Sequence, residues 1–149
     1  MDEPVFRAIS ADGSRHVSPP TVVIVDDDDE ILHVLTLLFE FEDFLVAGEA
    51  TNGVDAISLA RRHQPDFVVL DYRMPHMDGK ATAEVLKAVS PQTQVVAFSA
   101  VLNGTPEWAD AYLNKERIAD IAPFLTALIP AETVNDSASV MTSNSGAQF

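Results

Sequence analysis

The feature that most constrains the fold of this chain is a set of short apolar runs separated by stretches with helical spacing. The clearest runs are residues 21–26 (TVVIVD), 66–71 (DFVVLD) and 94–100 (QVVAFSA). None of them alternates between apolar and polar residues, so each predicts a strand that is buried on both faces. Strands of this kind occur in parallel sheets that helices cover on both sides.

Two further runs, residues 44–50 (FLVAGEA) and 111–115 (AYLNK), also have strand length. Four segments with helical spacing accompany the five runs: residues 31–39, the stretch from Val54 to the break at Pro65, residues 79–90, and residues 117–129 with Pro123 near the middle or at a break. Alternating strands and helices predict a doubly wound α/β domain with a five-stranded parallel sheet, which is a flavodoxin-like fold.

The two ends of the chain differ in composition from its centre. Residues 1–20 and 130–149 show no sustained period and are rich in Ser, Ala, Asn and Pro. We expect both to be flexible segments. Residues 21–129 then form a single domain, as the length of 149 residues and the hydrophobic content of 47% allow.

Composition also disfavours several classes of function. The chain has no cysteine and no leader-like start, which favours a reducing cytoplasm and excludes thiolate metal sites. Its 9 basic and 23 acidic residues give a net charge of -14, which would repel a phosphate backbone, so we expect no direct contact with nucleic acid. No apolar run approaches membrane-spanning length, so we expect no membrane insertion.

Polar residues follow the predicted strands at their carboxyl ends, where doubly wound sheets bind ligands. Asp26 and Asp27 end the first strand, Asp71 ends the third, Ser99 the fourth and Lys115 the fifth. Three carboxylates converging on one crevice repel one another unless a cation lies among them. A set of oxygen ligands without Cys or a nearby His suits Mg²⁺, which is the cofactor we predict.

Two local signals concern the starts of helices. Residues 28–30, which complete the acidic run DDDDE, are expected only to place negative charge at the start of the first helix. The stretch MPHMDG fits a turn after the third strand, in which Asp78 can cap the next helix and Gly79 permits tight backbone geometry.

Four segments, VVIVDDDDEI, DFVVLDYRMPHMDG, VVAFSA and AYLNK, together resemble the receiver domain of two-component response regulators. The resemblance extends over residues 21–129, with the segments in the right order. It implies that Asp71 is the phosphoacceptor. It also implies a Mg²⁺ site formed by Asp26, Asp27, Asp71 and the backbone carbonyl of Arg73.

The resemblance implies roles for four further residues near the carboxyl ends of the last two strands. Lys115 takes the position of the lysine that contacts the phosphoryl group. Ser99 matches the switch hydroxyl, with the small Ala100 beside it. Tyr112 matches the aromatic residue whose rotamer follows the switch.

This family resemblance implies a signalling switch rather than an enzyme with a separate substrate. Asp71 would accept a phosphoryl group from the phosphohistidine of a sensor histidine kinase or phosphotransfer protein, and the chain would then bind a downstream protein partner differently. Self-hydrolysis would reset it. No output domain fits in the roughly 20 residues after Ile129, so we expect a stand-alone or excised receiver.

The sequence departs from the family pattern in two places. The segment between Ser99 and Lys115 is shorter than usual by more than a helical turn, so we expect the fourth helix to be short, displaced or missing. Glu116 stands where the family usually has proline. These departures leave open a pseudo-receiver that is never phosphorylated and acts as an interaction module.

A Mg²⁺-dependent phosphatase of the haloacid dehalogenase type is a third possibility, because such enzymes also form an aspartyl phosphate after a strand. That family places a second Asp two residues after the nucleophile. Here that position is Arg73, which makes this reading the weakest of the three.

Overall fold

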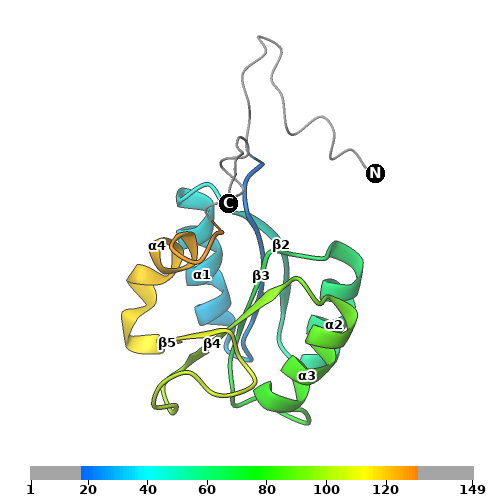
Figure 1. The fold of residues 1–149 in the computed structure, drawn as a ribbon. Helices are drawn as coiled ribbons and strands as arrows, with labels where there is room; N and C mark the ends of the chain where they lie inside the picture. Colours follow the sequence, from blue (N-terminus) through cyan, green and yellow to red (C-terminus); the bar gives the residue numbers. More distant parts are fainter. Residues whose placement is uncertain (1–17, 131–149) are drawn as a thin grey trace, which may run out of the picture. The chain divides into compact units, whose positions relative to one another are not determined.

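The computed structural model describes residues 18–130. The segments expected to be flexible, 1–20 and 130–149, therefore lie outside the described residues except for residues 18–20 and 130. Residues Pro19–Leu125 form one compact unit. Its elements, in chain order, are β1 (Thr21–Val25), α1 (Asp29–Phe41), β2 (Leu45–Ala50), α2 (Gly53–His63), β3 (Phe67–Leu70), α3 (Gly79–Val89), β4 (Gln94–Ser99), β5 (Ala111–Asn114), a 3-10 helix (Lys115–Asp120) and α4 (Ile121–Thr126) (Figure 1).

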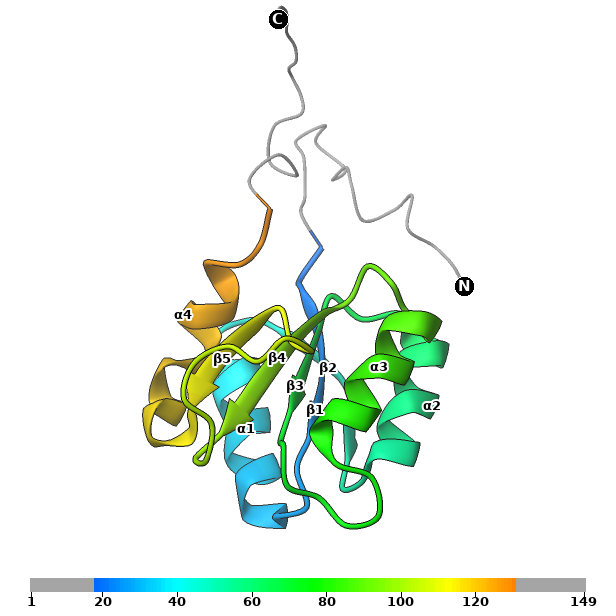
Figure 2. The same cartoon turned by 60° about the horizontal axis from the view of Figure 1, so that its bottom comes forward.

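All five strands belong to one parallel sheet, in the order β2-β1-β3-β4-β5. Helices α1 and α4 cover one face, and α2 and α3 cover the other (Figure 2). In the three central strands Ile24, Val69 and Val96 are fully buried, because both faces of the sheet are covered. The predicted flavodoxin-like fold is confirmed.

Side-chain caps fix where helices α1 and α3 begin. Asp28 accepts a hydrogen bond from the backbone N–H of Glu30 at 2.9 Å, and Asp29 and Glu30 occupy the first turn of α1. Asp78 caps α3 in the same way, accepting from the N–H of Ala81 at 3.0 Å. Each cap satisfies a donor that has no partner within the helix. The acids after Asp27 therefore lie at the start of α1, as the sequence predicts.

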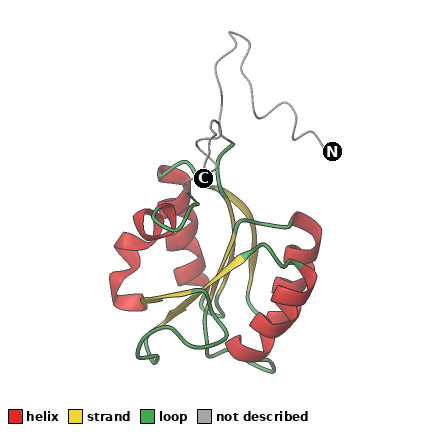
Figure 3. Ribbon diagram, viewed as in Figure 1, coloured by secondary structure: helices red, strands yellow, loops and turns green. Residues whose placement is uncertain are grey.

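The connection between β4 and β5 contains no helix in the described chain, and Figure 3 shows it as a loop throughout. Its one regular feature is a turn in which the N–H of Ala109 donates to the carbonyl of Pro106 at 3.2 Å. The expectation of a short or missing fourth helix is confirmed: the helix is missing. The helix labelled α4 follows β5 and corresponds to the last predicted helix.

That last helix differs from the prediction, which placed one helix over residues 117–129. The chain instead forms a 3-10 helix that is interrupted by non-helical dihedrals at Arg117 (φ -97°, ψ 30°), and α-helix extends only from Ile121 to Thr126. Pro123 explains the late start, because it has no N–H to donate to a carbonyl four residues earlier and is tolerated only in a first turn.

Glu116, at the position where the family resemblance suggested proline, has a structural role that proline could not fill. Its backbone N–H donates to Asn114 Oδ1 at 2.8 Å, which caps the 3-10 helix. A hydrogen bond thus orders the chain just after Lys115. No helix in the described part of the chain is both long and apolar enough to cross a bilayer.

Candidate functional site

The acidic residues and the lysine meet at the carboxyl ends of three strands. Asp26 directly follows β1, Asp71 follows β3 and Lys115 follows β5. The N–H of Asp71 donates to the carbonyl of Val25 at 3.0 Å, which extends the β1–β3 pairing by one residue and brings Asp71 beside Asp26. The parallel sheet thus gathers residues that lie far apart in the sequence.

Lys115 connects the two buried carboxylates. Its Nζ lies 2.7 Å from Asp26 Oδ2 and 3.4 Å from Asp71 Oδ1, and the two carboxylate side chains are 1% and 7% exposed. Burial alone would lower the pKa of Lys115. The hydrogen bond and charge of Asp26, together with Asp71, outweigh that effect and hold the lysine pKa above its ordinary value. Lys115 is therefore a fixed positive charge next to Asp71.

Asp71 is under opposing influences. Burial raises its pKa from 3.8 to about 6, the negative charge of Asp26 adds to the rise, and the Lys115 ammonium opposes it. One lysine thus leaves the carboxylates of the site incompletely compensated. A second cation at this point would stabilise the ionised form of Asp71.

The carboxylates fit a divalent cation. One oxygen from each of Asp26, Asp27 and Asp71 lies within 4.8 Å of the other two. Asp26 Oδ1 accepts the N–H of Asp28 at 2.9 Å, and its buried Oδ2 has the Lys115 ammonium as its polar contact. Asp27 is exposed, which leaves this side of the cluster accessible. An acidic triad of this kind is typical of the Mg²⁺ site of receiver domains, and its all-oxygen ligands suit Mg²⁺.

The loop after β3 approaches the start of α3 closely. A Cβ added at Gly79 would lie 2.9 Å from the carbonyl oxygen of Asp71 and 2.9 Å from Tyr72 Cα, while the N–H of Gly79 donates to the Tyr72 carbonyl at 2.8 Å. Only glycine allows this approach without displacing the backbone beside Asp71. Arg73, the predicted carbonyl ligand, lies in this loop two residues after Asp71 and has an exposed side chain.

The predicted switch residues lie near the same end of the sheet. Ser99 ends β4, next to β3, and is 2% exposed; its Oγ accepts the N–H of Val101 at 3.1 Å. The hydroxyl of Tyr112 donates to the carbonyl of Leu102 at 2.7 Å and accepts from Asn114 Nδ2 at 3.1 Å. Among the described residues, neither Ser99 nor Tyr112 forms a hydrogen bond to Asp71.

Ala100, which follows Ser99, is exposed. Taken together, these contacts bring four of the predicted residues into one cluster, whereas Tyr112 contacts the β4–β5 connection. The members of the cluster are Asp26, Asp27, Asp71 and Lys115.

One feature next to this cluster was not predicted from the sequence. Trp108, in the β4–β5 connection, stacks on Tyr72, with ring centroids 5.8 Å apart and an interplanar angle of 14°. Trp108 is the single tryptophan of the chain, and Tyr72 directly follows Asp71. A lone tryptophan in a short polar segment was the available signal.

Comparison with known proteins agrees with this geometry. Residues 22–116 match the response regulator receiver domain. The nitrate/nitrite response regulator protein NarL of Escherichia coli K12 is 34% identical over 105 residues, which are 66% of this chain and 49% of that protein. The transcriptional regulatory protein PdtaR of Mycobacterium tuberculosis H37Rv is 35% identical over 111 residues, which are 70% of this chain and 54% of PdtaR.

This chain thus spans about half the length of these two relatives (49% and 54%). A solved CheY-like receiver domain protein from Methanospirillum hungatei JF-1 superposes with a TM-score of 0.67 over 74% of this chain and 94% of the other, at 22% identity, and supports the fold alone. The match over residues 22–116 covers most of the compact unit, including the acidic cluster and Lys115. The chain therefore belongs to the response regulator receiver domain family.

Proposed function

We propose that this chain is a phosphorylation-dependent switch of a two-component or phosphorelay system, with Asp71 as its phosphoacceptor. The observation that carries the proposal is the position of Lys115, whose ammonium lies 2.7 Å from Asp26 and 3.4 Å from Asp71 at the carboxyl edge of the sheet. A fixed cation beside a buried carboxylate is what attack on a negatively charged phosphoryl group requires.

The proposed donor is the phosphohistidine of a sensor histidine kinase or a histidine phosphotransfer protein. A carboxylate oxygen of Asp71 attacks phosphorus, the bond from phosphorus to the donor imidazole nitrogen breaks, and an acyl phosphate forms. Lys115 pairs with one oxygen of the transferred group, and the Ser99 hydroxyl donates to another. Tyr112 changes its contacts with the β4–β5 connection as Ser99 is recruited.

The residues that would hold Mg²⁺ are Asp26, Asp27, Asp71 and the backbone carbonyl of Arg73. Bound Mg²⁺ would supply positive charge that offsets the repulsion between the carboxylates and the incoming phosphoryl oxygens. Support comes from the 4.8 Å grouping of the three carboxylate oxygens and from the raised pKa of Asp71, which lacks full compensation from Lys115 alone.

The output we propose is altered affinity for a downstream protein partner, without direct binding of nucleic acid, in the cytoplasm. The relatives NarL and PdtaR are named as regulators, and this chain matches about half of each, 49% and 54%. Residues 21–129 form the receiver in this proposal, and the segments 1–20 and 130–149 lie almost entirely outside the described residues. Self-phosphorylation and self-dephosphorylation are its only chemistry.

Two other readings remain testable. The absence of a helix between β4 and β5 favours a pseudo-receiver that binds partners without phosphorylation, yet all four charged residues of the site are present. A phosphatase of the haloacid dehalogenase type has less support, because the exposed Arg73 occupies the position of the required general acid.

Intact mass after incubation with acetyl phosphate tests the proposal. We expect a single added phosphoryl group in the presence of Mg²⁺, little or none when Mg²⁺ is chelated, and none in Asp71→Asn under either condition. If the unaltered protein gains no mass under conditions that label an ordinary receiver, the switch proposal fails and the pseudo-receiver takes its place.

A further inference from the structure

A groove of about 340 Å³ lies between α3 and the end of the β4–β5 connection. Its lining comes from Ala83, Glu84 and Lys87 of α3 and from residues 107–110 of the β4–β5 connection. Right-handed crossovers would place a helix between β4 and β5 on the same face as α3. That connection is a loop here (Figure 2), and its residues 107–110 form the second wall of the groove along α3.

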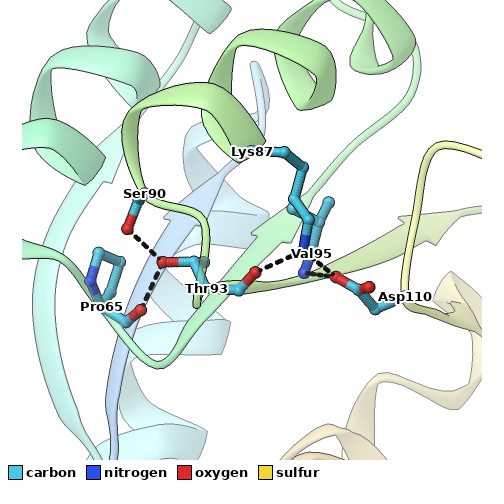
Figure 4. A network of polar contacts seen from close by, with 6 residues as sticks. All are labelled: Pro65, Lys87, Ser90, Thr93, Val95 and Asp110. Atoms are coloured by element: carbon cyan, nitrogen blue, oxygen red, sulfur yellow. Dashed lines mark hydrogen bonds and ion pairs between the residues drawn. The ribbon is translucent and has the colours of Figure 1, made fainter.

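A polar network connects the α3 side of the groove to the end of the β4–β5 connection (Figure 4). Lys87 Nζ donates to the carbonyl of Thr93 at 2.8 Å and to Asp110 Oδ2 at 2.9 Å, and the same Asp110 oxygen accepts the N–H of Val95 at 2.7 Å. Thr93 Oγ1 donates in turn to the carbonyl of Pro65 at 2.6 Å. The end of the connection at Asp110 is therefore tied to α3 and to the start of β4.

The opposite wall is connected to the phosphoacceptor. The indole of Trp108 stacks on Tyr72, the residue after Asp71, at a centroid distance of 5.8 Å. A Cβ at Gly79 would lie 3.3 Å from Trp108 Cη2 and 2.9 Å from the carbonyl oxygen of Asp71, so indole and phosphoacceptor backbone flank the same glycine. A change of the backbone at Asp71 would move this wall.

The charges of the groove indicate the chemistry of its occupant. Its four charged lining residues are three acids and one base. Glu84 is paired with Lys80 at 2.7 Å and Asp110 with Lys87 at 2.9 Å. Glu107 forms no ion pair with any described residue, although the more distant charge of Lys80 acts on it. A basic group on a partner would complete this set. A second copy of the chain is a poor occupant, because both copies would carry a net charge of -14.

We propose that this groove between α3 and residues 107–110 binds a basic segment of the downstream protein partner, with one apolar side chain against Trp108 and Ala109 and a Lys or Arg beside Glu107. Phosphorylation of Asp71 alters the affinity of the groove for this segment, through the stacked rings of Tyr72 and Trp108. This inference rests on the proposed phosphorylation switch. It specifies which surface of the receiver binds the downstream partner and which chemistry that partner presents.

The single tryptophan allows a direct test, because Trp108 lines this groove and no other tryptophan contributes to the fluorescence. Two pentapeptides serve as model ligands, one with a central leucine and one with a central glycine, each flanked by two basic residues on both sides. We expect the leucine peptide to bind saturably and at least about threefold more tightly than the glycine peptide, since apolar burial adds to charge attraction. Equal affinities would mean charge attraction alone and would overturn the proposal.

Charge variants locate the binding surface. Glu107→Lys is expected to weaken binding of the leucine peptide by about two- to fivefold, the range of an exposed charge pair. Glu40→Lys, an equal charge change at an exposed position of α1, is the matched control and should have the smaller effect. Equal weakening by both variants would show that the peptide is attracted to the acidic protein as a whole and does not bind in the groove.

The link to phosphorylation is measured with acetyl phosphate and Mg²⁺, with the labelled fraction of Asp71 followed by mass in the same samples. We expect labelling to change leucine-peptide affinity by about fivefold or more, as for modest allosteric coupling. Tyr72→Leu should retain peptide binding and lose this change.

The two possible failures are distinguishable. Absence of labelling contradicts the switch itself. Full labelling with unchanged peptide affinity contradicts only the coupled groove, as would an undiminished change in Tyr72→Leu.

Discussion

Asp71 combines two properties that a phosphoacceptor must reconcile: it is almost buried, and it must be ionised to attack. Burial and the charge of Asp26 raise its pKa to about 6, while Lys115 holds the pKa below the value that burial would otherwise give. The carboxylate is thus present at neutral pH but under-stabilised. Any added positive charge, from a metal or from a donor, lowers the free energy of this ionised state.

This environment makes the stability effect of Asp71→Asn depend on pH. The folded pKa of Asp71 lies above its ordinary value of 3.8, so the stability that Asp71 contributes is fully present below about pH 4 and is lost as pH rises through about 6. Asparagine does not titrate. Relative to the unaltered protein, Asp71→Asn should therefore become more stable between pH 4 and 7, by up to roughly 3 kcal/mol, since one pKa unit corresponds to about 1.4 kcal/mol.

Urea unfolding at several pH values, in buffer with a chelator, checks this expectation. Asp28→Asn is the matched control, because it makes the same chemical change at an exposed N-cap that asparagine also fills well. A difference between Asp71→Asn and the unaltered protein that stays constant from pH 4 to 7 would contradict the assigned burial and crowding.

Among the elements, the central strands and the Asp78 cap of α3 could be predicted, because their signals are local. Continuous apolar runs mark β1, β3 and β4, and the parallel arrangement then places Asp26, Asp71 and Lys115 at one edge. The 3-10 segment before α4 was missed, although Pro123 was visible, since helical periodicity does not distinguish a 3-10 turn from the start of an α-helix. The Trp108–Tyr72 contact joins segments far apart in sequence and depends on the path of a loop without a periodic pattern.

The β4–β5 connection should be the most dynamic part of the compact unit, and the structure narrows this expectation to residues 101–109. In this stretch the Val101 N–H donates to Ser99 Oγ, the Ala109 N–H donates to the Pro106 carbonyl, and the Leu102 carbonyl accepts from the Tyr112 hydroxyl. Residues 111–114, in contrast, pair with β4. Few protected amides imply a low free energy of local opening.

Hydrogen–deuterium exchange with fragment resolution measures this local opening. We expect exchange in residues 101–109 to be about a hundredfold or more faster than in β4, which pairs on both sides and is largely buried. Slow exchange throughout residues 101–109, at the rate of β4, would mean that Trp108 packing orders the whole connection.

For the molecule as a whole, negative charge lowers the stability of the fold in two distinct ways. The net charge of -14 opposes compactness through diffuse repulsion, which any salt screens. The carboxylates of Asp26, Asp27 and Asp71 repel one another within 4.8 Å, where a site-bound cation acts more strongly than screening. Sodium and magnesium salts at equal ionic strength should therefore stabilise the protein by different amounts.

Thermal melts of the unaltered protein, Asp27→Asn and Asp28→Asn resolve the two contributions. NaCl should raise the melting temperature of all three similarly. At tenfold excess over its dissociation constant, Mg²⁺ should add about 1.4 kcal/mol to the unaltered protein and to Asp28→Asn, a rise of roughly 5 °C or more for a domain of this size. Asp27→Asn should lose most of that gain, because it removes a proposed ligand, whereas Asp28 caps α1. An equal Mg²⁺ gain in all three proteins would assign the effect to the acidic run as a whole and remove the basis for a discrete metal site.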